Sequence, residues 1–251
     1  MAKSDKVMVI TGGSRGIGAA TARLAAEAGY AVCVNYARDR AAAERLVDEI
    51  KAAKGDAIAV RADVAVEADV VNLFRHVDTG LGRVTALVNN AGIVDRGMKV
   101  ELMSAARITR MMAVNVTGTI LCAREAIKRM SKKHGGKGGA IVNVSSIAAR
   151  LGAAGEYVDY AASKGAIDSF TIGLAREVGP EGIRVNAARP GIIRTEIHAS
   201  SGDPGRLERI GASAPLGRPG EAEEVARTIL WLCSDDASYL AGSIVDVSGG
   251  R

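Results

Sequence analysis

The feature that most constrains the fold of this sequence is a regular alternation of short β-branched runs with longer helical patterns. The short runs are apolar enough to be buried on both faces, as strands inside a parallel sheet are. Between them, residues 41–53 and 67–81 repeat apolar side chains at helical spacing. This alternation predicts right-handed βαβ units, and therefore a parallel sheet covered by helices on both faces. The predicted strands are residues 7–11, 31–35, 57–62, 86–89, 140–145, 184–188 and 243–247.

The length of the chain fits one domain. At about 150 residues per domain, 251 residues can form a single large α/β unit, and no Pro-rich linker or internal repeat divides them. We therefore expect one domain over residues 1–251. Only residues 198–219 break the alternation, with Gly, Ser and Pro ahead of the last helical pattern, so we expect residues 195–219 to form a mobile substrate-binding lid.

A glycine-rich loop follows the first predicted strand and opens a helix. It reads Thr-Gly-Gly-Ser-Arg-Gly-Ile-Gly over residues 11–18. Glycines at such a junction let the backbone approach a pyrophosphate, whose charge is stabilised by the N–H groups and dipole of the helix N-terminus. The Gly-x-x-x-Gly-x-Gly spacing differs from the commoner GxGxxG, so the position at the first βα junction carries the argument. The loop residues predicted to contact a dinucleotide are Gly12, Ser14, Arg15, Gly16, Ile17 and Gly18.

The end of the second predicted strand indicates which dinucleotide binds. NAD-binding proteins usually place Asp or Glu there to accept hydrogen bonds from the ribose 2′-hydroxyl. Here Tyr36 is followed by Ala37 and Arg38, and the first carboxylate is Asp39. Arg38 and Arg15 would supply two guanidiniums for a 2′-phosphate dianion. We therefore favour NADP(H), with Tyr36 and Arg38 in the cofactor site; in the NAD(H) alternative, Asp39 binds the ribose and Arg38 is solvated.

Tyr160 and Lys164 stand four residues apart and would share one face of a helix. A phenol with a pKa of about 10 is a poor acid–base catalyst near neutral pH, but an adjacent ammonium and a nicotinamide cation both favour the phenolate. Lowering this pKa by about three units requires about 4 kcal/mol. Ser146 follows the fifth predicted strand, where parallel strands present ligand groups, and its hydroxyl would hold a carbonyl or alcohol oxygen. The Tyr-x-x-x-Lys spacing alone would also suit a surface pair.

The ordered set of motifs resembles the short-chain dehydrogenase/reductase (SDR) family, from the first strand to the terminal Gly249-Gly250. The resemblance implies a single Rossmann-type three-layer αβα domain with a seven-stranded parallel sheet. It also implies an oxidoreductase that moves a hydride between a nicotinamide and a carbonyl or secondary alcohol. The matching positions are the glycine loop, Asp63, residues 89–92, Asn115, Ser146, Tyr160, Lys164, residues 190–191 and Thr195.

The resemblance implies a role for each catalytic residue. Tyr160 would be the proton donor or acceptor, and Lys164 would hold the nicotinamide ribose while lowering the tyrosine pKa. Ser146 would orient the substrate oxygen, and Asn115 would support a water relay by bonding the backbone near the site. Ser146 and Tyr160 are separated by one residue more than in many relatives, so Ser145 is an alternative; alignment of the strand favours Ser146.

For the cofactor, the resemblance implies contacts beyond the glycine loop, and no metal. Asp63 and Val64 would meet the adenine, and Asn90 and Gly92 would meet the adenosine ribose side. On the nicotinamide side, the expected contacts to the carboxamide and phosphates are Ile193 and Thr195, with Pro190 and Gly191 approaching the cofactor.

The substrate stays open at this point. The resemblance is to the glucose 1-dehydrogenase-like and 3-oxoacyl-[acyl-carrier-protein] reductase-like branch, especially to uncharacterised bacterial oxidoreductases. A carrier-protein substrate would use basic surface near the site, for which Arg124, Lys128 and Arg129 are candidates, whereas a sugar would need polar groups in the lid. A function of another class is also open: a catalytically idle NADP-binding sensor, or a nucleic-acid-binding protein of this fold.

Composition narrows the partners. The net charge is +5, but the basic residues are scattered and aromatics are only 3% of the chain, so we expect no nucleic-acid partner. The longest stretch without a charge, residues 111–123, is too short to span a bilayer, so we expect no membrane partner. Cys33, Cys122 and Cys233 lack zinc-site spacing and suit buried free thiols. Without a secretory signal at the N-terminus, we expect a cytoplasmic protein.

Self-association is the remaining expectation. The resemblance implies a homotetramer built from paired long helices and the C-terminal strand. Residues 120–127, 167–174 and 243–247 are apolar enough to form its interfaces.

Overall fold

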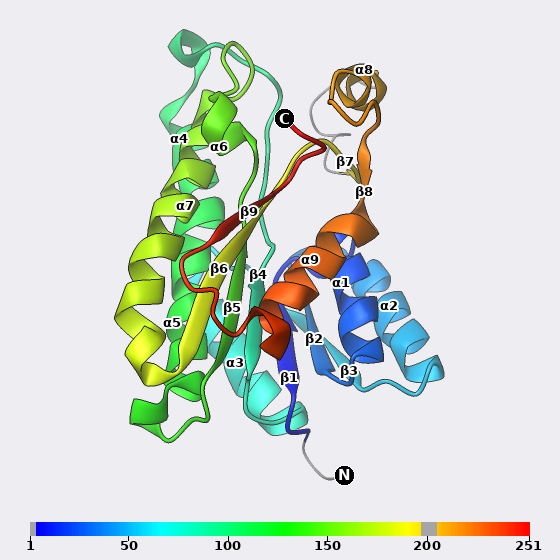
Figure 1. Ribbon diagram of the computed structural model, residues 1–251, viewed down its shortest axis with the longest axis vertical. Coiled ribbons are helices and arrows are strands. Elements are labelled where there is room, and N and C mark those ends of the chain that lie inside the picture. The colour runs from blue at the N-terminus through cyan, green and yellow to red at the C-terminus, as the bar shows by residue number, and fades with distance from the viewer. Residues whose placement is uncertain (1–3, 197–204) are drawn as a thin grey trace.

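The computed structural model describes residues 4–196 and 205–251, and its main element is a seven-stranded sheet in which all neighbouring strands run parallel (Figure 1). Each strand begins and ends within two residues of its predicted range, so the predicted fold class is confirmed. The strands of this sheet are β1 (Val7–Ile10), β2 (Ala31–Tyr36), β3 (Ala57–Arg61), β4 (Ala86–Asn89), β5 (Gly139–Val144), β6 (Ile183–Pro190) and β9 (Ile244–Val247).

The strand order positions the site. It is β3-β2-β1-β4-β5-β6-β9, so the chain moves outward from β1 to β3 and then returns to place β4 on the other side of β1. In this register Val9 lies opposite both Cys33 and Leu87. In open α/β sheets, ligands bind in the crevice beyond the carboxyl ends of the strands at such a reversal. A ligand-binding site is therefore expected in the crevice between the ends of β1 and β4.

Two layers of helices cover the sheet, and in Figure 1 the blue helices near the N-terminus lie beside the orange helix near the C-terminus. One layer contains α1 (Gly16–Glu27), α2 (Arg40–Ala52) and α9 (Ala222–Cys233). The opposite layer contains α3 (Glu67–Gly80), α5 (Gly118–Met130) and α7 (Val158–Val178), with α4 (Ala105–Met112) leading into α5. Shorter helical segments are η1 (Val100–Leu102), η3 (Lys132–His134), α6 (Ala148–Leu151), η4 (Gly179–Glu181), α8 (Arg206–Ala212) and η6 (Asp235–Ala237).

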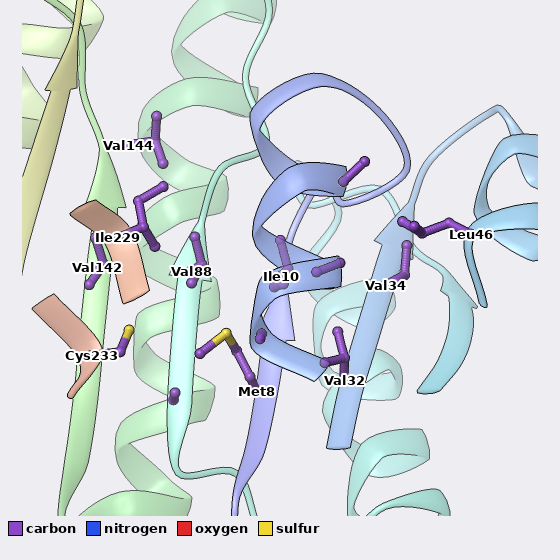
Figure 2. Packing of buried hydrophobic residues seen from close by; sticks show 14 of the residues in the cluster. Met8, Ile10, Val32, Val34, Leu46, Val88, Val142, Val144, Ile229 and Cys233 are labelled. Carbon is purple, nitrogen blue, oxygen red and sulfur yellow. The ribbon is translucent and has the colours of Figure 1, made fainter. Parts of the chain in front are cut away.

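The core has two halves because side chains alternate along each strand. Met8 and Ile10 of β1 point into the layer of α1, α2 and α9, which Figure 2 shows from close by. Val7 and Val9 point into the layer of α3, α5 and α7. All four residues are fully buried, which explains why the strands read as continuous apolar runs.

The three cysteines are buried free thiols, as predicted. Cys33 and Cys122 lie in one half of the core and Cys233 lies in the other. Burial raises the pKa of Cys122 and of Cys233 to about 12, because the thiolate would lose its hydration. Their thiols are therefore packing groups and not nucleophiles.

Three features of the fold were not predicted. A π-helical turn, η2 (Ala113–Thr117), joins α4 to α5. A second parallel sheet, made of β7 (Ile193–Arg194) and β8 (Gly220–Glu221), brackets the predicted lid at its two ends. The described part of that lid includes α8, whereas residues 197–204 lie outside the described residues.

The basic group on α5 is paired with acids. Arg124 contacts Glu67 at 2.7 Å, and Lys128 contacts Glu125 at 2.7 Å. Arg129 contacts Asp78 on α3, also at 2.7 Å. On this face of α5, all three basic residues are therefore neutralised by carboxylates. It is not the basic surface that was expected for the docking of a carrier protein.

Within residues 4–196 and 205–251, no helix combines the length and apolar character needed to cross a bilayer. The same residues contain no group of three or more His, Cys, Asp or Glu side chains arranged to hold a metal ion.

Candidate active site

A cavity of about 630 Å³ opens at the carboxyl ends of the central strands, where the strand order reverses. Its volume lies within the range of about 300–1,000 Å³ that is typical of small-molecule sites. Gly12 reaches it from the end of β1, Tyr36 from β2, Asn90 from β4 and Ser146 from β5. Tyr160, from the first turn of α7, lies on the same wall as Ser146. The structure thus brings together residues that the sequence separates by up to about 150 positions.

The glycine loop has the geometry of an anion cradle. Gly12 and Gly16 adopt φ values of +58° and +51°, which side chains other than glycine rarely accept. A Cβ on Gly18 would lie 2.6 Å from both Asn90 Nδ2 and the Gly12 carbonyl oxygen, so this position has no space for one. Arg15 occupies the N-cap of α1 and makes no capping hydrogen bond with its side chain, and Gly16 and Ile17 of the first turn line the cavity. The cradle therefore fits a pyrophosphate.

Two asparagines hold this loop in place. Asn35 Oδ1 accepts a hydrogen bond from the Gly12 N–H at 3.2 Å, while its amide donates to the carbonyls at the end of β3. Asn90 Nδ2 donates to the carbonyls of Thr11 at 3.0 Å and Gly12 at 2.9 Å. Sequence reasoning missed Asn35, and it gave Asn90 only a contact to the cofactor ribose. In the structure the Asn90 amide is engaged with the loop itself.

The corner beyond β2 carries two exposed guanidiniums. Arg15 and Arg38 both line the cavity and are exposed, and neither has a carboxylate partner among the described residues. Asp39 instead caps α2, because its Oδ1 accepts a hydrogen bond from the Ala42 N–H at 2.9 Å. One carboxylate oxygen of Asp39 is thus engaged with the first turn of α2, while Asp39 also lines the cavity.

The remaining predicted cofactor residues line the same cavity. Val64 is buried and Asp63 is exposed, with Asp63 Oδ1 accepting a hydrogen bond from the Ala65 N–H. A Cβ on Gly16 would lie 3.1 Å from Thr195 Cγ2, so the glycine loop and Thr195 stand close together. The other predicted residues on the cavity wall are Ser14, Ile17, Gly92, Pro190, Gly191 and Ile193.

Ser146, Tyr160 and Lys164 form the polar centre of the cavity. Ser146 lies beside the Tyr160 phenol, close enough for its hydroxyl to lower the pKa of that phenol. The Lys164 ammonium lies 5.8 Å from the centre of the Tyr160 ring and donates to the Val144 carbonyl oxygen at 2.6 Å. Ser145, the alternative to Ser146, is buried and its Oγ donates to the Lys164 carbonyl oxygen at 3.3 Å. Ser146 is therefore the serine that meets the phenol.

The electrostatics of this centre without a cofactor differ from those expected for the cofactor-bound site. Burial raises the pKa of Tyr160 above its usual value, and the hydrogen bond from Ser146 opposes the rise only in part. Burial also lowers the pKa of Lys164 to about 8, which Asp168 opposes. We expected Lys164 and a bound nicotinamide cation together to lower the pKa of Tyr160. The protein's own groups act in the opposite direction, because withdrawal of the phenolate from water outweighs the single hydrogen bond.

Asn115 lies in the π-helical turn η2 and is almost fully buried. Its Oδ1 accepts a hydrogen bond from the Ile93 N–H at 2.8 Å, and its Nδ2 donates to the Ile93 carbonyl oxygen at 3.0 Å. Nδ2 also lies 3.0 Å from Ser163 Oγ, which connects this clamp to α7. Single π-turns inside helices are frequent at functional sites, and this one directs an amide side chain at the backbone of the cavity wall.

Sequence reasoning also missed an ion pair that adjoins Tyr160. Asp159 precedes the tyrosine on α7 and pairs with Arg107 of α4, which is 52 residues away in the sequence. The adjacency of Asp159 to Tyr160 was visible in the sequence, but nothing there indicated Arg107 as its partner.

Known proteins resemble this chain over nearly its whole length. A sequence family described as enoyl-(acyl carrier protein) reductase matches residues 12–251. The Escherichia coli (strain K12) protein called uncharacterized oxidoreductase YgfF is 54% identical over 245 residues, which cover 98% of this chain and 99% of that protein. A 3-oxoacyl-[acyl-carrier-protein] reductase from Synechocystis is 38% identical over 250 residues, covering 99% of this chain and 98% of that one.

A solved structure agrees with these sequence matches. The short-chain dehydrogenase/reductase from Serratia marcescens BCRC 10948 superposes with a TM-score of 0.90 at 32% identity and covers 98% of both chains. Such likeness over the whole length, together with a pyrophosphate cradle and a Ser–Tyr–Lys centre in one cavity, implies binding of a nicotinamide cofactor. The chain belongs to the short-chain dehydrogenase/reductase family of oxidoreductases.

Proposed function

We propose that this chain is an NADP(H)-dependent oxidoreductase that interconverts a carbonyl and a secondary alcohol, with Tyr160 as the proton donor or acceptor. The observation that carries the proposal is that Ser146, Tyr160 and Lys164 line the same cavity as the anion cradle, with the Lys164 ammonium 5.8 Å from the centre of the Tyr160 ring. A phenol, a hydroxyl and an ammonium in one partly dry cavity suit proton transfer to an oxygen atom.

The chain's own residues would handle the proton. When bound, the nicotinamide cofactor supplies or accepts the hydride. In the reducing direction, the Tyr160 O–H donates its proton to the substrate oxygen, and Ser146 donates a hydrogen bond to the same oxygen. Lys164 provides positive charge close to the phenolate that Tyr160 becomes, and that phenolate regains a proton from water. Asn115 keeps the Ile93 backbone fixed on the cavity wall.

Substitution of the tyrosine tests the proton step. Tyr160→Phe should lower kcat by more than about tenfold, equivalent to a barrier increase above about 1.4 kcal/mol, while fluorescence titration shows NADPH binding nearly intact. Tyr239→Phe is the matched control, because Tyr239 is fully exposed and does not line the cavity. Retention of more than about a tenth of wild-type kcat by Tyr160→Phe would refute the assignment.

The choice of NADP(H) over NAD(H) rests on the guanidiniums of Arg15 and Arg38, which line the cavity and have no carboxylate partner within residues 4–196 and 205–251. Arg38→Ala should raise KM for NADPH by tenfold or more and leave KM for NADH within about twofold, because only the 2′-phosphate loses a partner. Arg40→Ala is the control, since Arg40 is a neighbouring exposed arginine that pairs with Glu44. Equal KM values for the two cofactors in the wild type would overturn this choice.

The substrate is best identified by screening. Ketones, aldoses, quinones and acetoacetyl thioesters, each offered with NADPH and with NADH, cover the sugar and 3-oxoacyl alternatives together. The ion pairs on α5 remove the main sequence argument for a docked carrier protein, so the screen should include free thioesters. Nucleic-acid retention at physiological salt with no turnover of any carbonyl would favour an idle sensor or a nucleic-acid-binding protein instead.

Two further proposals concern the whole molecule. Residues 195–219 would close over bound substrate as a lid, and the described ends of this segment are joined by the β7–β8 pair. A homotetramer would bury the isoleucines that α5 and α7 expose, Ile120 and Ile172, which are 41% and 38% accessible. Light scattering that gives a monomer at micromolar concentration would contradict the tetramer.

A further inference from the structure

The ion pair beside the tyrosine is the most buried one among the described residues. Arg107 Nε donates to Asp159 Oδ2 at 2.8 Å and Arg107 Nη2 donates to Oδ1 at 3.2 Å, in a two-pronged geometry. The two side chains are only 8% and 3% exposed. In every other ion pair of the described chain at least one partner is more exposed than either of these.

Such a pair is a poor device for stability alone. Withdrawal of two charges from water is costly, and apolar side chains of similar volume often stabilise a core equally well. The fixed orientation of a two-pronged guanidinium–carboxylate contact, by contrast, defines geometry. A role in positioning therefore explains this pair better than a role in stability.

Each partner makes one more contact, and both contacts lead to the cavity. Asp159 Oδ1 accepts a hydrogen bond from the backbone N–H of Tyr160 at 3.0 Å, in the first turn of α7. Arg107 Nη1 donates to the carbonyl oxygen of Arg96 at 2.7 Å. The pair thus connects the backbone of the proposed acid–base tyrosine to the segment of residues 93–99.

That segment contributes to the cavity wall. Ile93 and Val94 line the cavity, as do Tyr157 and Tyr160 at the start of α7. Four contacts hold the segment: Asn115 with the backbone of Ile93, Arg110 with the Asp95 carboxylate, Arg107 with the carbonyl of Arg96, and the Met98 N–H with the Glu156 carbonyl oxygen at 2.6 Å. Two of these four depend on a charged side chain, and Arg107 is the one whose guanidinium also binds Asp159 beside Tyr160.

We propose that Arg107 and Asp159 are a positioning pair that fixes the separation between segment 93–99 and the Tyr160 phenol, and so sets the width of the substrate half of the cavity. The inference rests on the proposed carbonyl–alcohol chemistry. Neither residue lines the cavity, so both act through the backbones that they hold. Their loss should disturb alignment of the substrate oxygen with the phenol more than cofactor binding, because the anion cradle is built on β1, β2 and α1.

Two variants separate the contacts of the pair. Arg107→Lys retains a positive charge for Asp159 but cannot also bind the Arg96 carbonyl with a planar fork. Asp159→Asn keeps an acceptor for the Tyr160 N–H but removes the charge that holds Arg107. The control is Asp78→Asn, which breaks the contact of Arg129 with Asp78 between α5 and α3, away from the cavity.

Two measurements read the result. Steady-state kinetics should show kcat about tenfold lower in Arg107→Lys and Asp159→Asn, with KM for NADPH within about twofold of wild type. Hydrogen–deuterium exchange of the substrate-free protein should be at least about fivefold faster in residues 93–99 of both variants. Asp78→Asn should leave kcat and the exchange of residues 93–99 unchanged.

The outcomes distinguish this inference from the proposed function. If kcat stays within twofold of wild type in a folded Arg107→Lys, or if kcat and NADPH binding fall in parallel, the pair has no positioning role. If the wild type reduces no carbonyl at all, the proposed function fails, and the exchange measurement still decides whether the pair controls segment 93–99: faster exchange supports that coupling and unchanged exchange overturns it. Should Asp159→Asn not fold, Arg107→Lys carries both measurements.

Discussion

Lys164 allows a direct test of the electrostatics of the site. Its side chain is 5% exposed, and burial lowers its pKa from 10.5 to about 8, against the opposing influence of Asp168. The difference between these two values corresponds to about 3 kcal/mol. Folding of the cofactor-free protein near neutral pH therefore includes the cost of burying an ammonium, and Lys164→Met, which has a similar length and no charge, should avoid that cost.

The pKa values of Lys164 in the folded and unfolded states determine whether stability rises or falls with pH. Between pH 8 and pH 10.5 the unfolded chain holds the Lys164 proton and the folded chain does not, so the stability of the wild type rises with pH across this window. The free-energy cost of burying the Lys164 ammonium is fully present at pH values below its pKa in the folded protein. It is about 3 kcal/mol near pH 7 and falls to about 1 kcal/mol near pH 9.5. The stability of Lys164→Met relative to wild type should therefore decrease by about 2 kcal/mol between these two pH values.

Comparing the stability difference between Lys164→Met and wild type at two pH values cancels the largest contribution that does not depend on the Lys164 charge. Lys164→Met also loses the hydrogen bond to the Val144 carbonyl, which is worth about 1 kcal/mol, but this offset is present at both pH values. The assay is urea unfolding of both proteins without cofactor, at one protein concentration, near pH 7 and near pH 9.5. A gap that changes by less than about 0.5 kcal/mol, or that widens with pH, would refute the assignment of a buried, charged Lys164.

Three other substitutions test separate parts of the structure. Gly18→Ala should abolish NADPH binding in a titration, because its Cβ would lie 2.6 Å from Asn90 Nδ2; binding within twofold of wild type would refute the cradle geometry. Asp39→Ala should cost about 1 kcal/mol in urea unfolding through the lost helix cap, and should leave KM for NADH within about twofold; a large rise in that KM would show that Asp39 binds the ribose. Glu125→Gln should cost about 3 kcal/mol near pH 7. Burial disfavours ionisation of Glu125, but hydrogen bonds from neighbouring cations outweigh it and hold its pKa below 4.5. The loss should therefore shrink as the pH falls below 4.5 and the wild type itself loses this stabilisation; a loss that stays constant on acidification would contradict this.

The parts of the site that could be predicted depend on short stretches of chain. The glycine loop was identifiable because its function needs left-handed backbone at a strand-to-helix junction, and Gly12 and Gly16 have that conformation. Tyr160 and Lys164 lie on one helix, so their proximity follows from their spacing alone.

The parts that could not be predicted depend on contacts between distant segments. The sequence offered Asp39 only as the ribose ligand of the NAD(H) alternative, and its role as the cap of α2 is visible only in the structure. The π-turn at Asn115 directs its amide to the Ile93 backbone. Ile93 is 22 residues away in the sequence, so no pattern of neighbouring residues predicts this contact. The rise in the pKa of Tyr160 in the cofactor-free protein could not be predicted either, because the burial of a phenol depends on all the residues packed around it.

By itself, the sequence determined the parallel sheet and its seven strands, because apolar periodicity and glycine positions encode local backbone conformation and burial. It also identified the family, through the resemblance of an ordered set of motifs. Only the tertiary structure decided how the cavity is built: which asparagines hold the loop, which serine meets the phenol, and that Arg107 pairs with Asp159. The physical reason is that hydrogen bonds, ion pairs and desolvation act over a few ångströms in space. Residues that are 52 positions apart in the chain acquire such a contact only when the fold brings α4 against α7.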